Sequence, residues 1–203
     1  MNKGLLLAVA SALLAGCSTT TNAPPPSSTP VAEQVSGQPE QLAVQPVLLE
    51  EMQKIASEII EAGGLAVVGT DKSKSLELAL DKAKINGRIE LARMLDARFE
   101  ALEKAFSEET GIPYDSLLLS GFNSAAKLIK QQIAGSVAQT LKYEPDGETS
   151  TAYAVMVLNP KVIADQLAQE KDLYARLQKT KAFAALTQEV QTYEAFQAVK
   201  STP

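Results

Sequence analysis

The feature that most constrains the fold of this chain is a division near residue 46, between a segment that cannot build a core and one that can. Residues 18–46 contain Pro24-Pro25-Pro26, Pro30, Pro39 and Pro46 among Ser and Thr, with few large apolar side chains. Such a stretch cannot bury enough apolar surface to offset its ordering entropy, so we expect a disordered tether. Roughly 155 residues then remain, which is enough for one domain with a core.

Ahead of the tether lies Cys17, the only cysteine among 203 residues. Lys3 is followed by an apolar run from Leu5 to Leu14, and the run ends in Leu14-Ala15-Gly16-Cys17. This arrangement resembles a bacterial lipobox, in which the chain is cut before the cysteine and its thiol carries a lipid. The run is too short to span a bilayer, which takes about 20 apolar residues. The alternatives are an ordinary signal peptide and a lone buried cysteine.

A chain anchored at Cys17 would leave the membrane slowly, because two or three acyl chains, such as palmitate, would sit on one residue. Ser18, and not Asp, follows the cysteine. By resemblance to Gram-negative lipoproteins, Ser18 favours sorting to the cell outer membrane, with the domain in the periplasm or at the surface. We therefore expect residues 1–16 to be a signal peptide and residues 17–46 a lipidated tether. The covalent lipid is the only cofactor expected.

The composition argues against several classes of function. Lys and Arg number 19 and Asp and Glu 24, so no basic stripe is available to bind nucleic acid. His and Trp are absent, which removes the commonest general base and metal ligand and one platform for sugars. We find no nucleophile elbow, phosphate loop or metal-ligand cluster, and expect no enzyme activity, no metal and no small-molecule substrate. A hydrolase with two carboxylates remains open, because Asp and Glu are scattered throughout.

The folding segment alternates helical and strand periodicity. We predict helices over 47–62, 74–106 and 116–134, and strands over 65–69, 137–144 and 149–158. Thr70, Asp71 or Ser73 is expected to cap the long helix, and Asp115 the one after it. The last two strands form a hairpin about Pro145-Asp146-Gly147-Glu148, with the second arm inside the sheet and the first at its edge. Asn159-Pro160 begins another helix.

This order indicates an α+β fold. We expect a small three-stranded antiparallel sheet packed on one face by a long helix and further helices, with residues 47–160 as the domain and 161–203 as a C-terminal helical extension. Small residues four apart on the long helix should let it lie close to the sheet; they are Ala79, Ala83 and Gly87. Five core residues are expected to be buried together: Val67, Leu80, Leu95, Val155 and Val157.

The C-terminal segment poses a problem of length. Residues 161–200 contain no Gly or Pro, and forty helical residues would reach about 60 Å, more than the width of such a domain. We expect either a break near Thr180 or a projecting helix. Phe183, Leu186, Val190 and Tyr193 form an apolar stripe that either packs back on the same core or contacts another subunit.

Together with the lipobox and tether, several short runs resemble the LPP-twenty lipoprotein family over roughly residues 60–165. They are Leu65-Ala66-Val67-Val68-Gly69, Leu78-Ala79, Ala83, Leu91-Ala92-Arg93 and Ala154-Val155-Met156-Val157-Leu158. The family includes the flagellar outer-membrane disk lipoprotein FlgP and is related to the N-terminal domain of the flagellar ring protein FlgT. The longer tether and the C-terminal extension depart from its shortest members.

The resemblance implies a non-enzymatic structural or assembly component of the cell envelope, flagellum-associated in some members. Such proteins bind other proteins, including copies of themselves, and the family supplies no catalytic residues. The alternative is a tethered binding module that contacts peptidoglycan or regulates a cell-wall enzyme.

Overall fold

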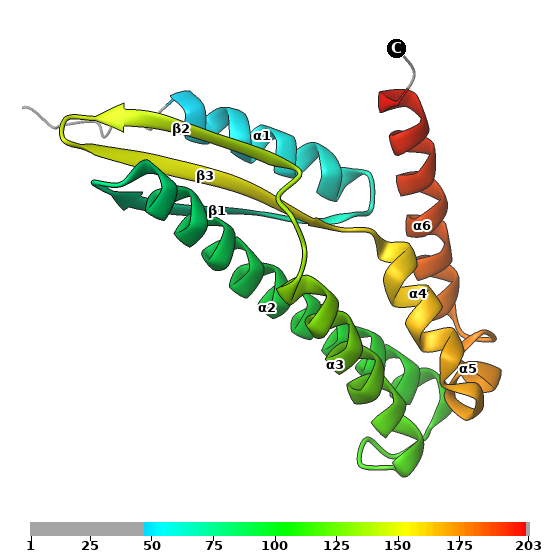
Figure 1. Cartoon of the computed structure of the whole chain (residues 1–203). Coiled ribbons are helices and arrows are strands. Elements are labelled where there is room, and N and C mark those ends of the chain that lie inside the picture. Colours follow the sequence, from blue (N-terminus) through cyan, green and yellow to red (C-terminus); the bar gives the residue numbers. More distant parts are fainter. Residues whose placement is uncertain (1–46, 202–203) are drawn as a thin grey trace, which may run out of the picture. The chain divides into compact units, whose positions relative to one another are not determined.

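A computed structural model describes residues 47–201 and confirms the α+β class (Figure 1). Its elements, in chain order, are α1 (Val47–Glu61), β1 (Leu65–Ser73), α2 (Leu76–Thr110), a 3-10 turn η1 (Leu117–Leu119), α3 (Ser120–Ala134), β2 (Thr140–Asp146), β3 (Thr149–Leu158), α4 (Pro160–Gln169), α5 (Lys171–Leu177) and α6 (Lys181–Lys200).

The sheet has the antiparallel order β1-β3-β2. The predicted arrangement of the hairpin is confirmed, because β3 lies in the centre and β2 at one edge; β1 forms the other edge. The pairing of β1 with β3 runs from Leu65↔Leu158 to Ser73↔Ser150, so β1 is longer than predicted. Its polar second half is strand because β3 supplies a partner for every residue. The N-cap of α2 is therefore not among the three predicted residues but is Ser75, whose hydroxyl accepts from the Leu78 N–H.

One face of the sheet is covered by α2 at very short range. Ala79, Ala83 and Gly87 are buried in this contact, which confirms the predicted close approach. A Cβ placed on Gly69 of β1 would lie 2.1 Å from the Ala83 carbonyl oxygen, and one on Gly87 would lie 2.5 Å from the Met156 side chain of β3. The helix therefore lies over the boundary between β1 and β3, backbone against backbone.

The other face of the sheet is covered by α1, whereas the sequence placed the helices on one face. Met52, Ala56 and Ile59 of α1 pack on Tyr153 and Val155 of β3. Strand alternation explains the difference, because neighbouring apolar residues of β3 point to opposite faces. The five predicted core residues are consequently not buried together. Leu95, Val67 and Leu80 belong to the α2 side, and Val155 and Val157 to the α1 side; only Leu95 and Val155 are fully buried.

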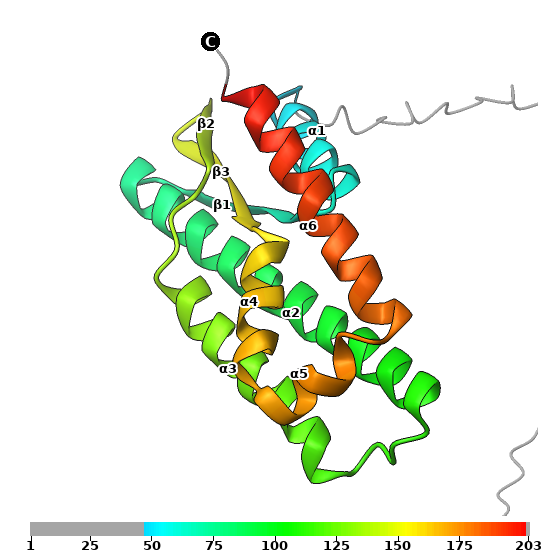
Figure 2. The ribbon, with the colours of Figure 1, turned by 90° about the vertical axis from the view of Figure 1, so that its right-hand side faces the viewer.

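The second half of α2 extends past the sheet and packs on α3 and α6 (Figure 2). Phe106 and Phe122 meet edge to face there, with ring centroids 5.8 Å apart. Gly111 ends α2 in the left-handed conformation, with φ of 69°. Ser116 then precedes η1, and Leu119 precedes α3, so the prediction that Asp115 caps this helix is wrong.

The C-terminal helices share this core. The chain turns after α5, and the Thr180 hydroxyl caps α6 by accepting from the Phe183 N–H at 3.2 Å. Of the two alternatives, the break near Thr180 is therefore observed and the projecting helix is not. Glu109 of α2 also accepts from the first N–H groups of α6. A further break at Glu170 separates α4 from α5. Ile163, Leu167 and Leu186 belong to the same cluster as Leu95, so residue 160 does not divide two cores.

Candidate functional site

The predicted lipobox residues Leu14, Ala15, Gly16 and Cys17, the sorting residue Ser18 and the tether lie outside the described residues. The described part begins at Val47, the first residue of α1. This end of α1 lies beside the hairpin strands (Figure 1), where the Lys142 ammonium is 2.6 Å from the Glu51 carboxylate. The first described residue therefore lies at the hairpin end of the sheet.

The apolar stripe of α6 folds back on the chain itself. Leu186 and Tyr193 are buried, and Phe183 packs edge to face on Tyr174, with centroids 5.4 Å apart. Val190 is half-buried. The hairpin alternative is therefore the one observed. The expectation of a partner contact does not hold for Leu186 and Tyr193, because the core of the same chain already covers both.

A groove of about 730 Å³ runs between α5 and α6. Its walls are uncharged and consist of Tyr174, Gln178, Phe183, Ala184, Thr187, Gln188, Gln191 and Thr192. The hydroxyls of Thr187 and Thr192 donate to carbonyls of their own helix at 2.9 Å, so they face the groove as acceptors. The three glutamines supply amide donors. Neutral hydrogen-bonding groups beside aromatic rings suit an uncharged polar ligand.

A smaller pocket of about 380 Å³ lies where the α1–β1 turn, α2 and α6 meet. Its lining is mostly apolar or small: Ile60, Gly63, Gly64, Leu65, Met94, Ala97 and Ala101, with Arg98 and Glu189 completing the wall. Arg98 and Glu189 form an ion pair, with about a third of each side chain exposed. Sequence reasoning missed this pocket because α6 completes it only by folding back.

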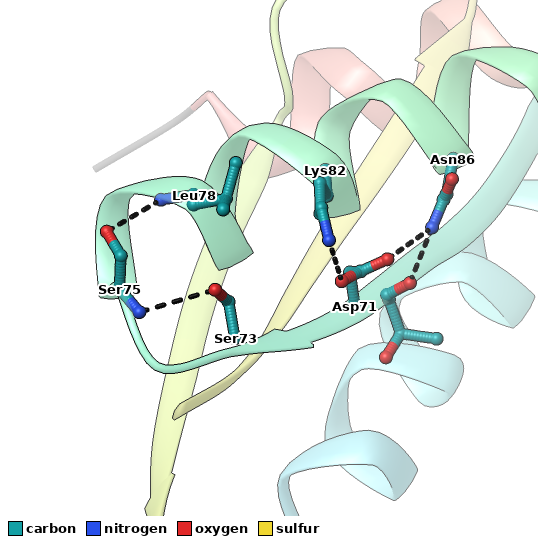
Figure 3. A network of polar contacts seen from close by, with 7 residues as sticks. Asp71, Ser73, Ser75, Leu78, Lys82 and Asn86 are labelled. Atoms are coloured by element: carbon teal, nitrogen blue, oxygen red, sulfur yellow. Dashed lines mark hydrogen bonds and ion pairs between the residues drawn. The ribbon is translucent and has the colours of Figure 1, made fainter. Parts of the chain in front are cut away.

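The outer edge of β1 carries a polar network at its far end (Figure 3). The Asn86 amide donates to the Thr70 carbonyl at 2.9 Å and to the Asp71 carboxylate at 3.2 Å, and Lys82 pairs with Asp71 at 3.6 Å. Beside Val67 and Val68 the edge is only partly buried, whereas Ala66 is buried. A groove of about 500 Å³ follows it there, walled by Gln53, Ala56, Ser57 and Glu90.

One tyrosine is strongly perturbed. Burial, reinforced by a 2.5 Å hydrogen bond to the Glu144 carboxylate, raises the pKa of Tyr153 to about 12. Tyr153 lies between the sheet and α1, so its hydroxyl remains protonated and serves as a structural donor. The perturbation therefore marks a packing site and not a nucleophile.

The two-carboxylate hypothesis requires two acids in one groove. Glu170 and Asp172 line a groove of about 540 Å³ together with Lys171. Glu103 and Asp115 line a space of about 230 Å³ next to Tyr114. Burial, and then the charge of Glu100, raises the pKa of Glu103, while Asp115 is exposed. Such a shallow site differs from the deep cleft with facing carboxylates that a glycosidase requires.

Residues 47–201 also bear on metal binding and on membrane spanning. Among them no group of three or more Asp or Glu side chains is arranged to hold a metal ion. None of the helices in this range is both long and apolar enough to cross a membrane. No family model matches the chain, and no curated protein or solved structure is significantly similar to it.

Proposed function

We propose that this chain is a lipid-anchored structural or assembly protein of the cell outer membrane, similar to the LPP-twenty lipoproteins. The observation that carries the proposal is Leu14-Ala15-Gly16-Cys17 at the end of a short apolar run. The arrangement of the helices around the sheet also supports the proposal. Both sheet faces are covered by helices of residues 47–201, so the folded unit is complete without the anchor.

Replacing the cysteine tests the anchor. Cys17→Ser should leave a protein that no longer fractionates with membranes, while the wild-type chain should yield an N-terminal peptide starting at an acylated Cys17 in mass spectrometry. Cys17→Ser should melt at the same temperature as the delipidated wild type. An unmodified, soluble wild-type product would overturn the proposal.

The sorting residue gives a matched control. Ser18→Asp keeps the lipobox but changes the residue after the cysteine, and should move the lipidated chain from the outer to the inner membrane. Ser18→Ala should stay in the outer membrane. If both variants fractionate identically, the outer-membrane part of the proposal fails while the lipid anchor stands.

The structural role requires protein partners, and the resemblance offers a flagellar ring or disk as one setting. A deletion strain imaged by electron cryotomography should lack such a layer around its motors if this setting is correct. Intact motors together with altered cell shape or lysis would favour a cell-wall role.

The α5–α6 groove favours a second candidate, a module that contacts peptidoglycan. Its amides and hydroxyls next to Tyr174 and Phe183 match the chemistry of a glycan strand. Gln188→Ala combined with Gln191→Ala should abolish co-sedimentation of the folded chain with purified sacculi. Gln131→Ala on α3, also an exposed glutamine, is the control. If wild-type protein does not sediment with sacculi, this candidate is excluded.

A further inference from the structure

The pocket where the α1–β1 turn, α2 and α6 meet owes its space to small residues. Gly63 and Gly64 form the turn. A Cβ on Gly63 would lie 2.9 Å from the Glu189 carbonyl oxygen, and one on Gly64 would lie 2.6 Å from the Tyr193 ring. The turn thus contacts α6 through its backbone, without side chains to fill the space beside it, and exposed Ala97 of α2 lines the same space. The resulting volume of about 380 Å³ is near the lower end of the range for small-ligand sites.

One part of the lining is suited to an aliphatic side chain. Ile60 of α1 and Met94 of α2 both line the pocket, and Ile60 is 47% exposed while Met94 is partly exposed. Covering such apolar surface with a ligand removes it from water, which favours binding. These side chains need no hydrogen bond, so the charged part of the wall must provide the specificity.

The charged part is a single ion pair that joins two helices. Arg98 of α2 donates from Nη2 to Oε2 of Glu189 on α6, and the two side chains are 30% and 34% exposed. No other hydrogen bond of these two side chains is found among residues 47–201. A guanidinium has five N–H donors, and a carboxylate has about four acceptor positions. Each group therefore keeps free bonding capacity, with the positive charge on α2 and the negative charge on α6.

We propose that this pocket binds a free apolar α-amino acid of the leucine type. The ligand carboxylate accepts from Arg98, its ammonium donates to Glu189, and its aliphatic side chain covers Ile60 and Met94. An α-amino acid is the fitting occupant because it carries both charges on one carbon, next to each other as in the ion pair, so that four charges alternate in sign. A ligand with one charge, such as a fatty acid or an amine, meets a pair that is already neutral.

Binding at this position also joins α6 more firmly to the rest of the chain. Of the 20 residues of α6, only Leu186 and Tyr193 are buried. A ligand held between Arg98 and Glu189 adds a contact between α2 and α6 and should raise the melting temperature by mass action. The site needs no lipid, so it stands or falls separately from the anchor proposed above.

The test uses the chain from Ser18 onward, which contains all the described residues. Isothermal titration calorimetry should show one leucine bound per chain, with a Kd of about 1 mM or tighter, and leucine should raise the melting temperature. N-acetyl-leucine keeps only the carboxylate, and leucinamide keeps only the ammonium. Each should bind at least about tenfold more weakly than leucine.

Two variants should separate the single-charge ligands. Glu189→Gln leaves Arg98 without its counter-charge and should bind N-acetyl-leucine more tightly than leucinamide. Arg98→Gln leaves Glu189 alone and should show the opposite preference. A purely structural loss of the ion pair would affect both ligands alike. Arg93→Gln is the matched control, because Arg93 is also an α2 arginine paired with a glutamate, Glu90, and it should bind all three ligands as the wild type does.

Ala97→Phe fills the pocket without changing the ion pair and should abolish leucine binding. Because Ala97 is exposed, this variant should fold, and circular dichroism checks that it does. No binding of leucine to the wild type at about 10 mM overturns the proposal. Equal affinities for the three ligands overturn it as well, as do Arg98 and Glu189 variants without opposite preferences. Wild-type affinity in Ala97→Phe would place any leucine site elsewhere and would also overturn it.

Discussion

The two faces of the sheet are covered in opposite ways. On the α2 face the contact is made by the smallest side chains, Gly69, Ala83 and Gly87, and the backbones themselves nearly touch. On the α1 face it is made by large side chains, among them Met52, Ile59 and Tyr153. The same strands therefore contact α2 almost backbone to backbone on one face. On the other face large side chains separate them from α1.

This difference predicts which kind of substitution destabilises the contact on each face. A close backbone contact tolerates no added atom, because backbone cannot move aside as a side chain can. A contact through large side chains is sensitive to deletion, because removing atoms leaves a cavity. Additions should therefore damage the α2 face and deletions the α1 face.

The largest effect is expected from the smallest addition. Gly69→Ala places a methyl group 2.1 Å from the Ala83 carbonyl oxygen and should lower the free energy of unfolding by at least about 3 kcal/mol. Gly135→Ala is the matched control, since its new Cβ meets nothing closer than 3.8 Å. It should change stability by less than about 0.5 kcal/mol in urea denaturation. Similar losses in both variants would contradict the close contact.

A deletion on the α1 face comes second. Met52 is fully buried, and Met52→Ala should cost about 2–4 kcal/mol through lost burial and a cavity between α1 and β3. Leu117→Ala, at a side chain that is 92% exposed, should cost almost nothing. Thermal melts of the two variants measure the contrast. An unchanged melting temperature for Met52→Ala would show that α1 is not packed on the sheet.

The smallest effect concerns the hydroxyl of Tyr153 and depends on pH. Tyr153→Phe removes the hydrogen bond to Glu144 and should cost about 1 kcal/mol near neutral pH. Because the pKa of Tyr153 is raised from 10.0 to about 12, the folded state holds the proton more tightly than the unfolded state. This contribution is complete below pH 10 and is lost as the pH rises from 10 to about 12.

The measurement is urea denaturation across that pH interval. The wild type should lose stability more steeply than Tyr153→Phe, while Tyr143→Phe, at a half-exposed side chain of β2, should keep the wild-type slope. Equal slopes for wild type and Tyr153→Phe would mean that Tyr153 is not buried.

The small-residue face was predictable from the sequence, and the large-residue face was not. Ala79, Ala83 and Gly87 recur every fourth residue, and that spacing alone indicates a close contact. In contrast, Leu65-Ala66-Val67-Val68 is apolar at every position, which indicates cover on both faces or on one face and an edge but does not identify the second helix. A sequence stretch of this kind predicts burial but not the helix that provides it.

The hairpin strand β2 differs from its sequence pattern in another way. The strand predicted over 137–144 begins later, at Thr140, and Val137 before it is 83% exposed. Leu141 pairs with Ala154 and so shares the α2 face, but α2 covers only β1 and β3. Periodicity gives the side of a strand, while the position of the neighbouring helix decides whether that side is covered.

The interaction surfaces were the least predictable part. The polar network at the β1 edge depends on Asn86 reaching the Thr70 carbonyl, and the α5–α6 groove depends on the turn at Thr180. Both arise from contacts between segments that no local pattern relates. The stripe on α6 was visible in the sequence, but its pattern did not decide between the chain's own core and another subunit.

The pairing of β1 with β3 also has a consequence for how the chain is made. The ribosome and any export channel release β1 long before Leu158, the residue that pairs with Leu65. During that interval both edges of β1 lack a neighbour, whereas β2 and β3 emerge together and can form a hairpin at once. A nascent chain therefore presents two bare strand edges, and two chains made close together risk exchanging strands. Dilution or a chaperone that shields Leu65–Gly69 should protect the yield of correctly folded protein.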